Sequence, residues 1–291
     1  MNCGMKDSLW RKRAGWAGRG FCALALGLWA MSSAADERKF GYVYEADVLP
    51  KGTWEFEQWI TARTGKEHGR YARWDLREEI EYGLTERLTT ALYLNLEDEY
   101  SSGVEEETDT EPAEEEASSE GLDFKGFSSE WKYQLASPYR DPVGVLVYFE
   151  AGSDLASETE LEQKLIFSKN WERWLAAANV SIEQEWEYED GETVKEGKLE
   201  LAAGLSRKFT DHWSGGLEVR NVRIYEESFA FEHEEANATF LGPNASYGSG
   251  KSWATLSVLP QIHGEGEHAE DGLELTEFER VEVRLLAGVP L

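Results

Sequence analysis

Charged side chains that recur at every second position are the residues of this chain best suited to chemistry. Alternate side chains of a strand point to the same face, so each such run would collect its charges on one side. In a narrow interior, charges of one sign would select ions or polar solutes, whereas facing arginine and glutamate residues would brace the interior by pairing. Acidic residues outnumber basic ones in this set, which favours cations if a path is open. The candidates are Glu55, Glu57, Arg63, Arg73, Arg77, Glu79, Glu81, Glu130, Lys132, Glu150, Glu183, Glu185, Glu218, Arg220, Glu282 and Arg284.

A histidine and a serine come nearest to a catalytic pair. His212 and Ser214 would share one face of a strand, with Glu218 at the same parity, and such a set would suit lipid hydrolysis. The pair falls in a predicted turn, 209–216, and no G-x-S-x-G elbow occurs in the chain. The remaining histidines show no metal-ligand spacing. We therefore expect no catalytic residue, no metal ligand, no cofactor and no enzyme activity.

The segment 98–121 is the most acidic part of the chain. Eight carboxylates lie between positions 105 and 116, with threonine and proline among them. Such a composition cannot bury a core and predicts a disordered loop. Its oxygens could gather divalent cations loosely, although the spacing of a calcium-binding EF-hand loop is missing.

Composition and charge exclude several classes of protein. The 291 residues include 57 acidic and 29 basic side chains, for a formal net charge of -28. This charge would repel a phosphate backbone, so we expect no nucleic-acid partner. Hydrophobic residues make up 41% and aromatic residues 12%, which predicts a folded protein rather than a disordered acidic chain.

The first 35 residues predict a secretory signal peptide. Basic residues precede the apolar run 21–31, and small residues follow it, which places cleavage near Ala34 or Ala35. That run is too short to cross a bilayer as a helix. Cleavage would remove Cys3 and Cys22, so the mature chain would have neither disulfides nor thiolate chemistry.

From Thr53 onward, apolar and polar residues alternate with a period of two, which predicts strands. In 174–188, for example, Trp174, Val180 and Trp186 share one face, while Glu183 and Glu185 share the other. About twelve antiparallel strands (10 to 14) are expected. The segments are 53–63, 71–82, 88–97, 127–135, 143–150, 161–167, 174–188, 199–209, 216–225, 237–247, 253–262 and 277–291.

Strand length and connector pattern favour a transmembrane β-barrel over a secreted sandwich. Several segments run to ten residues or more, aromatic residues sit near their ends, and short turns alternate with longer acidic or glycine-rich links. The longer links include 153–159, 189–196, 226–235 and 263–272. We expect an all-β barrel over 36–291, with outer-membrane lipid, lipopolysaccharide and the barrel-assembly machinery as partners. The turn with His212 would then face the periplasm, away from outer-leaflet lipid.

Three blocks of the chain resemble a group of uncharacterised bacterial outer-membrane barrels, whose relatives are assigned to aromatic (phenol) degradation pathways. The blocks are 40–57, which begins Phe40-Gly41-Tyr42-Val43-Tyr44-Glu45-Ala46-Asp47, then 77–88, and Leu241-Gly242-Pro243. The resemblance implies a barrel in the outer membrane of a Gram-negative bacterium and carries no catalytic residues. Such barrels commonly end on an aromatic residue, whereas this chain ends Val289-Pro290-Leu291.

The function predicted from these features is a passive or weakly selective channel for small solutes, with an acidic lumen. A closed barrel with a structural or surface-interaction role is the alternative, and an outer-membrane lipid hydrolase is the third hypothesis. The alternation of residues does not decide between an open and a filled interior, because both would place charged side chains inside.

Overall fold

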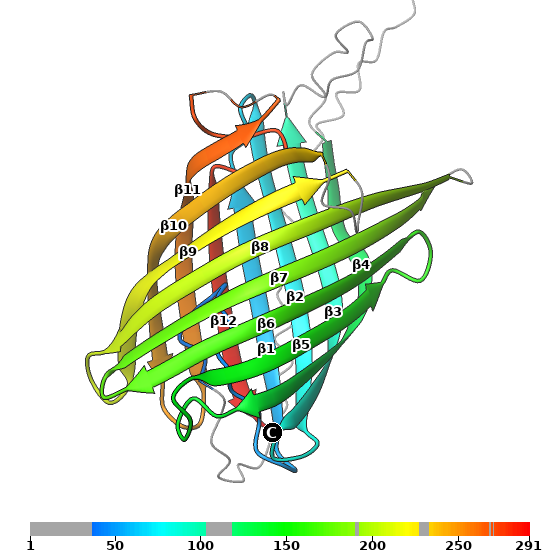
Figure 1. The fold of residues 1–291 in the computed structure, drawn as a ribbon. Helices are drawn as coiled ribbons and strands as arrows, with labels where there is room; N and C mark the ends of the chain where they lie inside the picture. The colour runs from blue at the N-terminus through cyan, green and yellow to red at the C-terminus, as the bar shows by residue number, and fades with distance from the viewer. Residues whose placement is uncertain (1–36, 103–117, 190–191, 227–232, 268, 270) are drawn as a thin grey trace, which may run out of the picture.

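The computed structural model describes residues 37–102, 118–189, 192–226, 233–267, 269 and 271–291. Within these ranges the chain forms twelve antiparallel strands that close into one barrel, with β1 hydrogen-bonded to β12 (Figure 1). The predicted antiparallel β-barrel is confirmed, and the sandwich alternative is wrong. No helix in the described part of the chain is long and apolar enough to cross a membrane. The strands are β1 (Trp54–Thr64), β2 (Arg70–Gly83), β3 (Leu88–Ser102), β4 (Ser118–Ala136), β5 (Gly144–Ser153), β6 (Glu158–Trp171), β7 (Trp174–Glu189), β8 (Glu192–Lys208), β9 (Trp213–Tyr225), β10 (Glu234–Gly248), β11 (Trp253–Gly266) and β12 (Val281–Pro290).

Each strand turns its apolar face outward and its polar face inward. In β4, Trp131 and Tyr133 are exposed, whereas Glu130 and Lys132 between and beside them are buried. A soluble sandwich would bury the apolar face and expose the charges. The reverse arrangement is that of a barrel whose outer surface meets lipid and whose interior is polar.

The connections define two ends of the barrel. The turn end holds 84–87, 137–143, 172–173, 209–212 and 249–252, and the C-terminus lies there (Figure 1). Among the described residues, the loop end holds 65–69, 154–157 and 271–280. Strands extend further toward the loop end than predicted, so the two ends differ less in connector length.

Two predicted loops are shorter in the structure. Of the acidic segment 98–121, residues 98–102 belong to β3 and 118–121 to β4, while 103–117 lie outside the described residues. The predicted link 189–196 is reduced to 190–191, which also lies outside them. Both errors have one cause: pairing to a neighbouring strand stabilises polar strand ends whose own composition favours a loop. The predicted signal peptide, 1–35, is likewise outside the described part of the chain.

A short connection at the loop end shows how local hydrogen bonds form a turn. The backbone N–H groups of Ala156, Ser157 and Glu158 donate to the Asp154 carboxylate over 2.8–3.1 Å. These bonds, led by the one from Ala156, hold the pKa of Asp154 well below its usual range. The aspartate side chain thus replaces strand partners for the three amides that follow β5.

The chain before β1 runs inside the barrel, and residues 37–49 are called the plug segment here. Phe40, Val43, Ala46 and Leu49 are almost fully buried. Phe40 packs against Gly204 of β8, where an added Cβ would lie only 2.6 Å from the phenyl ring. Residues 40–47 precede the first predicted strand, and nothing in their sequence indicated that they lie in the lumen.

The connection between β11 and β12 also folds inward, at the loop end. Residues 274–279 form the inner loop, in which Glu274, Phe278 and Glu279 are buried. Gln261 of β11 donates to the Glu274 carbonyl oxygen over 2.7 Å and accepts from the Glu274 amide over 2.8 Å. The expected strand 277–291 therefore begins only at Val281, because residues 277–280 belong to this loop and its approach to β12.

One carboxylate on the outer face generates a prediction about stability. Glu78 projects outward on β2 opposite Gln58 of β1, and its Oε2 is buried without a hydrogen-bond partner among the residues described. A charged group on the lipid face destabilises a barrel. We expect Glu78→Gln to raise the free energy of unfolding by about 1 kcal/mol, measured by urea titration of vesicle-inserted protein through tryptophan fluorescence.

The matched control is Glu86→Gln, in the exposed turn between β2 and β3. It should change the free energy of unfolding by less than about 0.5 kcal/mol. A lower free energy of unfolding in Glu78→Gln would show that the negative charge of Glu78 stabilises the barrel, contrary to the prediction.

Candidate functional site: the barrel lumen

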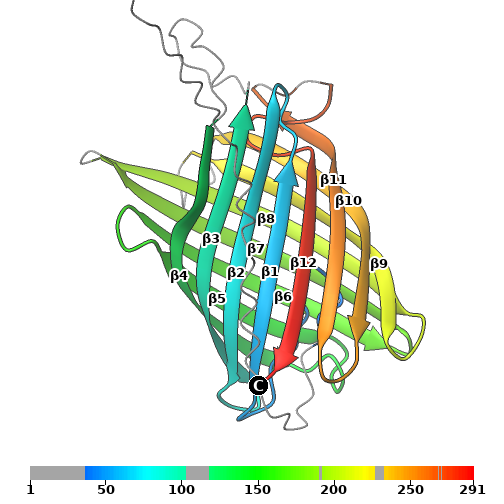
Figure 2. The ribbon, with the colours of Figure 1, turned by 180° about the vertical axis from the view of Figure 1, so that it is seen from behind.

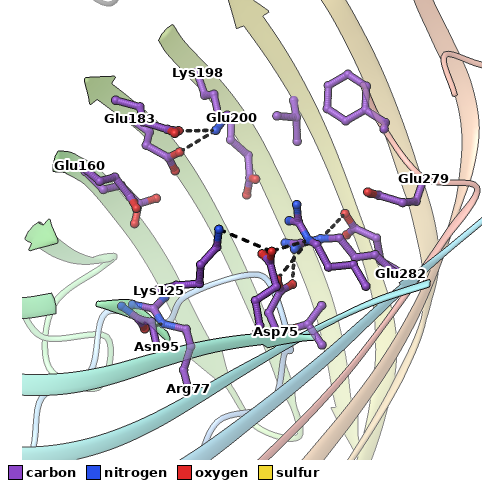
Figure 3. Close-up of a pocket in the computed structure, with 18 of the residues that line it drawn as sticks. Asp75, Arg77, Asn95, Lys125, Glu160, Glu183, Lys198, Glu200, Glu279 and Glu282 are labelled. Atoms are coloured by element: carbon purple, nitrogen blue, oxygen red, sulfur yellow. Dashed lines mark hydrogen bonds and ion pairs between the residues drawn. The ribbon is translucent and has the colours of Figure 1, made fainter. Parts of the chain in front are cut away.

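The lumen contains a cavity of about 540 Å³, which we call the lumen cavity (Figure 3). Glu277, Phe278 and Glu279 of the inner loop line it at the loop end. Toward the turn end, the Tyr42 ring of the plug segment packs 4.0 Å from the Arg284 guanidinium, which also lines the cavity. The cavity is therefore bounded by two inward-folded segments and by the strands between them.

Three neighbouring strands, β6, β7 and β8, form an acidic wall of the cavity. Their register sets like charges directly opposite one another, as in Glu160 with Glu185 and Glu185 with Glu196. Such pairs repel, and the Lys198 ammonium relieves part of the repulsion by lying 2.9–3.1 Å from three carboxylates. The wall comprises seven carboxylates and one ammonium: Glu158, Glu160, Glu162, Glu183, Glu185, Glu196, Glu200 and Lys198.

The strands β12, β1 and β2 form an arginine wall. Arg73 lies 3.1 Å from Asp75, Arg63 lies 3.5 Å from Glu282, and Arg63 also pairs with Asp75. Arg77 pairs with Glu150, which lies deeper in the lumen. The wall comprises four guanidinium groups and two carboxylates: Arg63, Arg73, Arg77, Arg284, Asp75 and Glu282.

These two walls face each other across the lumen. In the closed order of the barrel, β7 is six strands away from β1 in either direction, which is the largest separation that twelve strands allow. Figure 1 shows β6, β7 and β8 in front, and Figure 2, seen from behind, shows β12, β1 and β2. The close-up shows Glu160 and Glu183 on one side of the cavity and Asp75 and Glu282 on the other (Figure 3).

The plug segment is held by side chains of the wall, above all by Glu218 of β9. The carboxylate of Glu218 accepts the backbone N–H groups of Gly41, Tyr42 and Val43 over 3.0, 2.8 and 3.2 Å. It also accepts the amide of Asn244 over 2.9 Å. Hydrogen bonds to a buried charged acceptor are strong, so Glu218 anchors the middle of the plug segment.

Further polar side chains satisfy the rest of this backbone. Asn179 accepts the amide of Tyr44 over 2.6 Å and donates to its carbonyl oxygen over 3.0 Å. Ser168 and Thr89 accept the amides of Ala46 and Leu49, each over 3.0 Å. Polar side chains therefore point into the turn-end half because they must replace strand partners for an enclosed backbone. Apolar wall residues such as Leu146 and Leu175 pack against the plug segment between them.

A buried group of glutamates lies in the same half of the barrel. Carboxylate oxygens of Glu79, Glu81 and Glu130 lie within 4.8 Å of one another, an arrangement with the oxygen ligands that a divalent cation uses. The Lys132 ammonium pairs with Glu81 and lies 3.0 Å from Glu130. A positive charge from the chain itself therefore already occupies this group.

The structure places all sixteen predicted charged residues on the inner face. Half of them line the lumen cavity: Arg63, Arg73, Arg77, Glu183, Glu185, Arg220, Glu282 and Arg284. The other half are buried toward the turn end: Glu55, Glu57, Glu79, Glu81, Glu130, Lys132, Glu150 and Glu218. Further charged residues line the cavity outside the predicted set. All but one obey the same alternation: Asp75, Glu97, Glu158, Glu160, Glu162, Glu196, Lys198 and Glu200. The exception is Lys125, because the register of β4 against β3 shifts next to Gly126.

The histidine and serine of the possible hydrolase do not form a catalytic pair. His212 Nδ1 lies 2.8 Å from the Gly248 carbonyl oxygen, and no hydrogen bond joins His212 to Ser214 within the described residues. Glu218, the third member, binds the plug segment instead. The sequence spacing was compatible with a shared face, but the turn 209–212 directs the histidine to the neighbouring strand connection.

Solved structures that resemble this fold include two outer-membrane barrels described as a channel and a porin. The COG4313 outer membrane channel from Pseudomonas putida F1 matches with a TM-score of 0.54 at 10% identity, over 85% of this chain and 98% of that chain. The NanC porin matches with a TM-score of 0.50 at 8% identity, over 81% of this chain and 100% of that chain. At these identities the likeness concerns the fold alone. No curated protein matches the chain by sequence. Residues 32–291 match the family described as "Family of unknown function (DUF6662)", and the chain belongs to this family.

Proposed function

We propose that this protein is an outer-membrane channel for small polar solutes, with a preference for cations. The observation that supports this most directly is the charged cavity of about 540 Å³ enclosed by a barrel with an apolar outer surface. Carboxylates outnumber cationic groups among the residues that line the cavity. A lining with an excess of one charge sign favours passage of the opposite sign.

A second cavity supports a path past the plug segment. It has a volume of about 350 Å³ at the turn end, and its lining includes Lys39 and Asp47 of the plug segment with Asn170 and Ser206 of the wall. Solute could pass beside the plug segment on the side of β6 to β9, or the segment could shift. By either route, the plug segment is the part of the channel that most limits the passage of solute.

The alternative function is a closed barrel with a structural or surface role. The buried plug segment and its hydrogen bonds to Glu218 and Asn179 favour this alternative to the extent that they seal the turn end. Conductance separates the two proposals, because a sealed barrel gives no unitary current steps in a planar bilayer.

Other expectations from the sequence also remain proposals. Outer-membrane lipid, lipopolysaccharide and the assembly machinery are the partners that an apolar, exposed barrel surface would require. Transport of aromatic compounds is suggested only by the resemblance to barrels of degradation pathways. The charged lining of the lumen cavity favours polar solutes over aromatic hydrocarbons.

Releasing the plug segment should open the channel. Each hydrogen bond to a buried carboxylate contributes about 1.5–3 kcal/mol, so Glu218→Ala should raise the time-averaged conductance at least about tenfold. Gly204→Val should act in the same direction, because its side chain occupies the place of the Phe40 ring. Single-channel recording in planar bilayers measures both effects.

The control for these variants is Glu86→Gln, an exposed turn residue whose conductance should equal that of the unchanged protein. Heat-modifiable migration in gels would show that each variant is folded as a barrel. If folded Glu218→Ala and Gly204→Val both fail to conduct, the channel proposal is wrong and the closed-barrel alternative stands.

Cation preference should depend on pH through the inner loop. Burial, together with the carboxylates of Glu235 and Glu274, raises the pKa of Glu277. Its negative charge is therefore lost earlier than that of an ordinary glutamate as pH falls. We expect cation selectivity, measured as a reversal potential in a salt gradient, to fall as pH is lowered from neutrality, starting at a higher pH than the ordinary titration range of a glutamate.

Glu277→Gln tests the assignment of this effect. The variant should show lower cation selectivity at neutral pH and a smaller change on acidification. An unchanged pH profile in Glu277→Gln would assign the titration to other carboxylates.

A further inference from the structure

We propose that the lumen cavity binds small zwitterions, with the anionic end at the arginine wall and the cationic end at the acidic wall. The inference rests on the proposed function in one respect, since it names the class of solute that the channel recognises. Binding itself can be measured whether or not solute crosses the barrel. The proposed contacts are Arg284 on the arginine wall and Glu160 on the acidic wall.

On the arginine wall, Arg284 is the group available to an anion. Its Nε donates to Thr61 Oγ1 over 2.9 Å and its guanidinium lies 4.0 Å from the Tyr42 ring, contacts that orient it without neutralising it. No carboxylate of the described residues lies within ion-pairing distance of Arg284, whereas Arg63, Arg73 and Arg77 each have at least one. Arg284 therefore retains a positive charge that faces the cavity.

On the acidic wall, Glu160 is the corresponding group for a cation. Its neighbours across the strands are Gly152 and Glu185, neither of which is cationic. Lys164 pairs with Glu162, and Lys198 is shared by Glu183, Glu185 and Glu196. In the described part of the chain, the Glu160 side chain makes no ion pair, and Figure 3 shows it directed into the cavity.

The separation of charge distinguishes a zwitterion from a simple ion. Arg220 of β9 pairs with one carboxylate of each wall, Glu200 and Glu282. The excess negative charge of β6 to β8 still lies across the cavity from the excess positive charge of β12, β1 and β2. A simple anion bound at Arg284 is also repelled by the acidic wall. A simple cation bound at Glu160 leaves Arg284 without an anionic partner. A solute with both charges interacts favourably at both ends.

The cavity volume agrees with a ligand of this class. About 540 Å³ lies in the range of small-molecule sites, and the lining supplies hydroxyl and amide groups as well as charges, from Thr61, Ser128 and Asn95. An amino-acid-like solute with a short chain between its charges fits such a site. A large or strongly apolar solute would have to displace paired charges from the lining.

Equilibrium dialysis of the purified, detergent-solubilised barrel tests the proposal. The probes are radiolabelled 6-aminohexanoate, hexanoate and hexylamine, which share a carbon chain and differ in their charged ends. We expect 6-aminohexanoate to bind at least about tenfold more tightly than either analogue at low ionic strength. Arg284→Gln and Glu160→Gln should each reduce its affinity to the level of the singly charged analogues, whereas the turn variant Glu86→Gln should not change it.

Four results would overturn the proposal. Equal binding of hexylamine and 6-aminohexanoate would mean that the acidic wall collects cations without regard to the arginine wall. Equal binding of hexanoate and 6-aminohexanoate would mean that the acidic wall does not contribute to binding. If no probe bound detectably, the cavity would not be a binding site for this class of solute. Because Arg284 also contacts the plug segment, unchanged affinity in Glu160→Gln is decisive by itself.

Conductance separates this inference from the proposed function. Zwitterion binding without current steps, in Glu218→Ala as well as in the unchanged protein, would leave a binding barrel and contradict the channel. Current steps without preferential zwitterion binding would leave the channel and contradict the present inference.

Discussion

The pairing of β1 with β12 is the interaction on which the rest of this structure depends. Ten residue pairs, from Glu55 with Pro290 to Thr64 with Val281, join the first strand to the last. They satisfy the backbone groups of two strand edges, which lipid could not hydrogen-bond. They also convert the two faces of each strand into an outside and an inside. Only after closure do charged side chains from distant parts of the chain, such as Glu57 and Glu130, become members of one enclosed lumen.

Closure also decides which charges can neutralise one another. Most ion pairs form along a strand or between adjacent strands, as Lys198 does with Glu183, whereas Arg77 of β2 pairs with Glu150 of β5. In the described residues no ion pair joins β6, β7 or β8 directly to β12, β1 or β2, although Arg220 of β9 contacts both Glu200 of β8 and Glu282 of β12. Strand order therefore separates an acidic wall from an arginine wall. The net charge of -28 shows only that acidic residues outnumber basic ones, and not where they lie. The strand order of the barrel thus sets the direction of the electrostatic field across the cavity.

The plug segment divides the interior into a turn-end half and a loop-end half, whose inward side chains make different contacts. An extended backbone inside a barrel finds no free strand edge, because every strand is already paired, so side chains must satisfy it. Glu218, Asn179, Ser168 and Thr89 do so in the turn-end half. In the loop-end half, the charges of the two walls face the lumen cavity. The turn-end half thus holds the plug segment, whereas the loop-end half combines ion pairs such as Arg63 with Asp75 and an open cavity.

The sequence by itself determined the strands, their approximate number and the parity of their charges, because the period of two is a local property of each strand. In β7, for example, the alternation of Trp186 with Glu185 is visible without any partner strand. The ends of strands were less predictable, since polar residues at 98–102 are held in β3 by pairing with β4. Only the tertiary structure decided that Glu218 binds the plug segment, that His212 turns away from Ser214 and that Glu160 faces the arginine wall. Gly41 and Glu218 are 177 residues apart, and no local pattern records a contact over that distance, because it exists only once the barrel has closed around the chain.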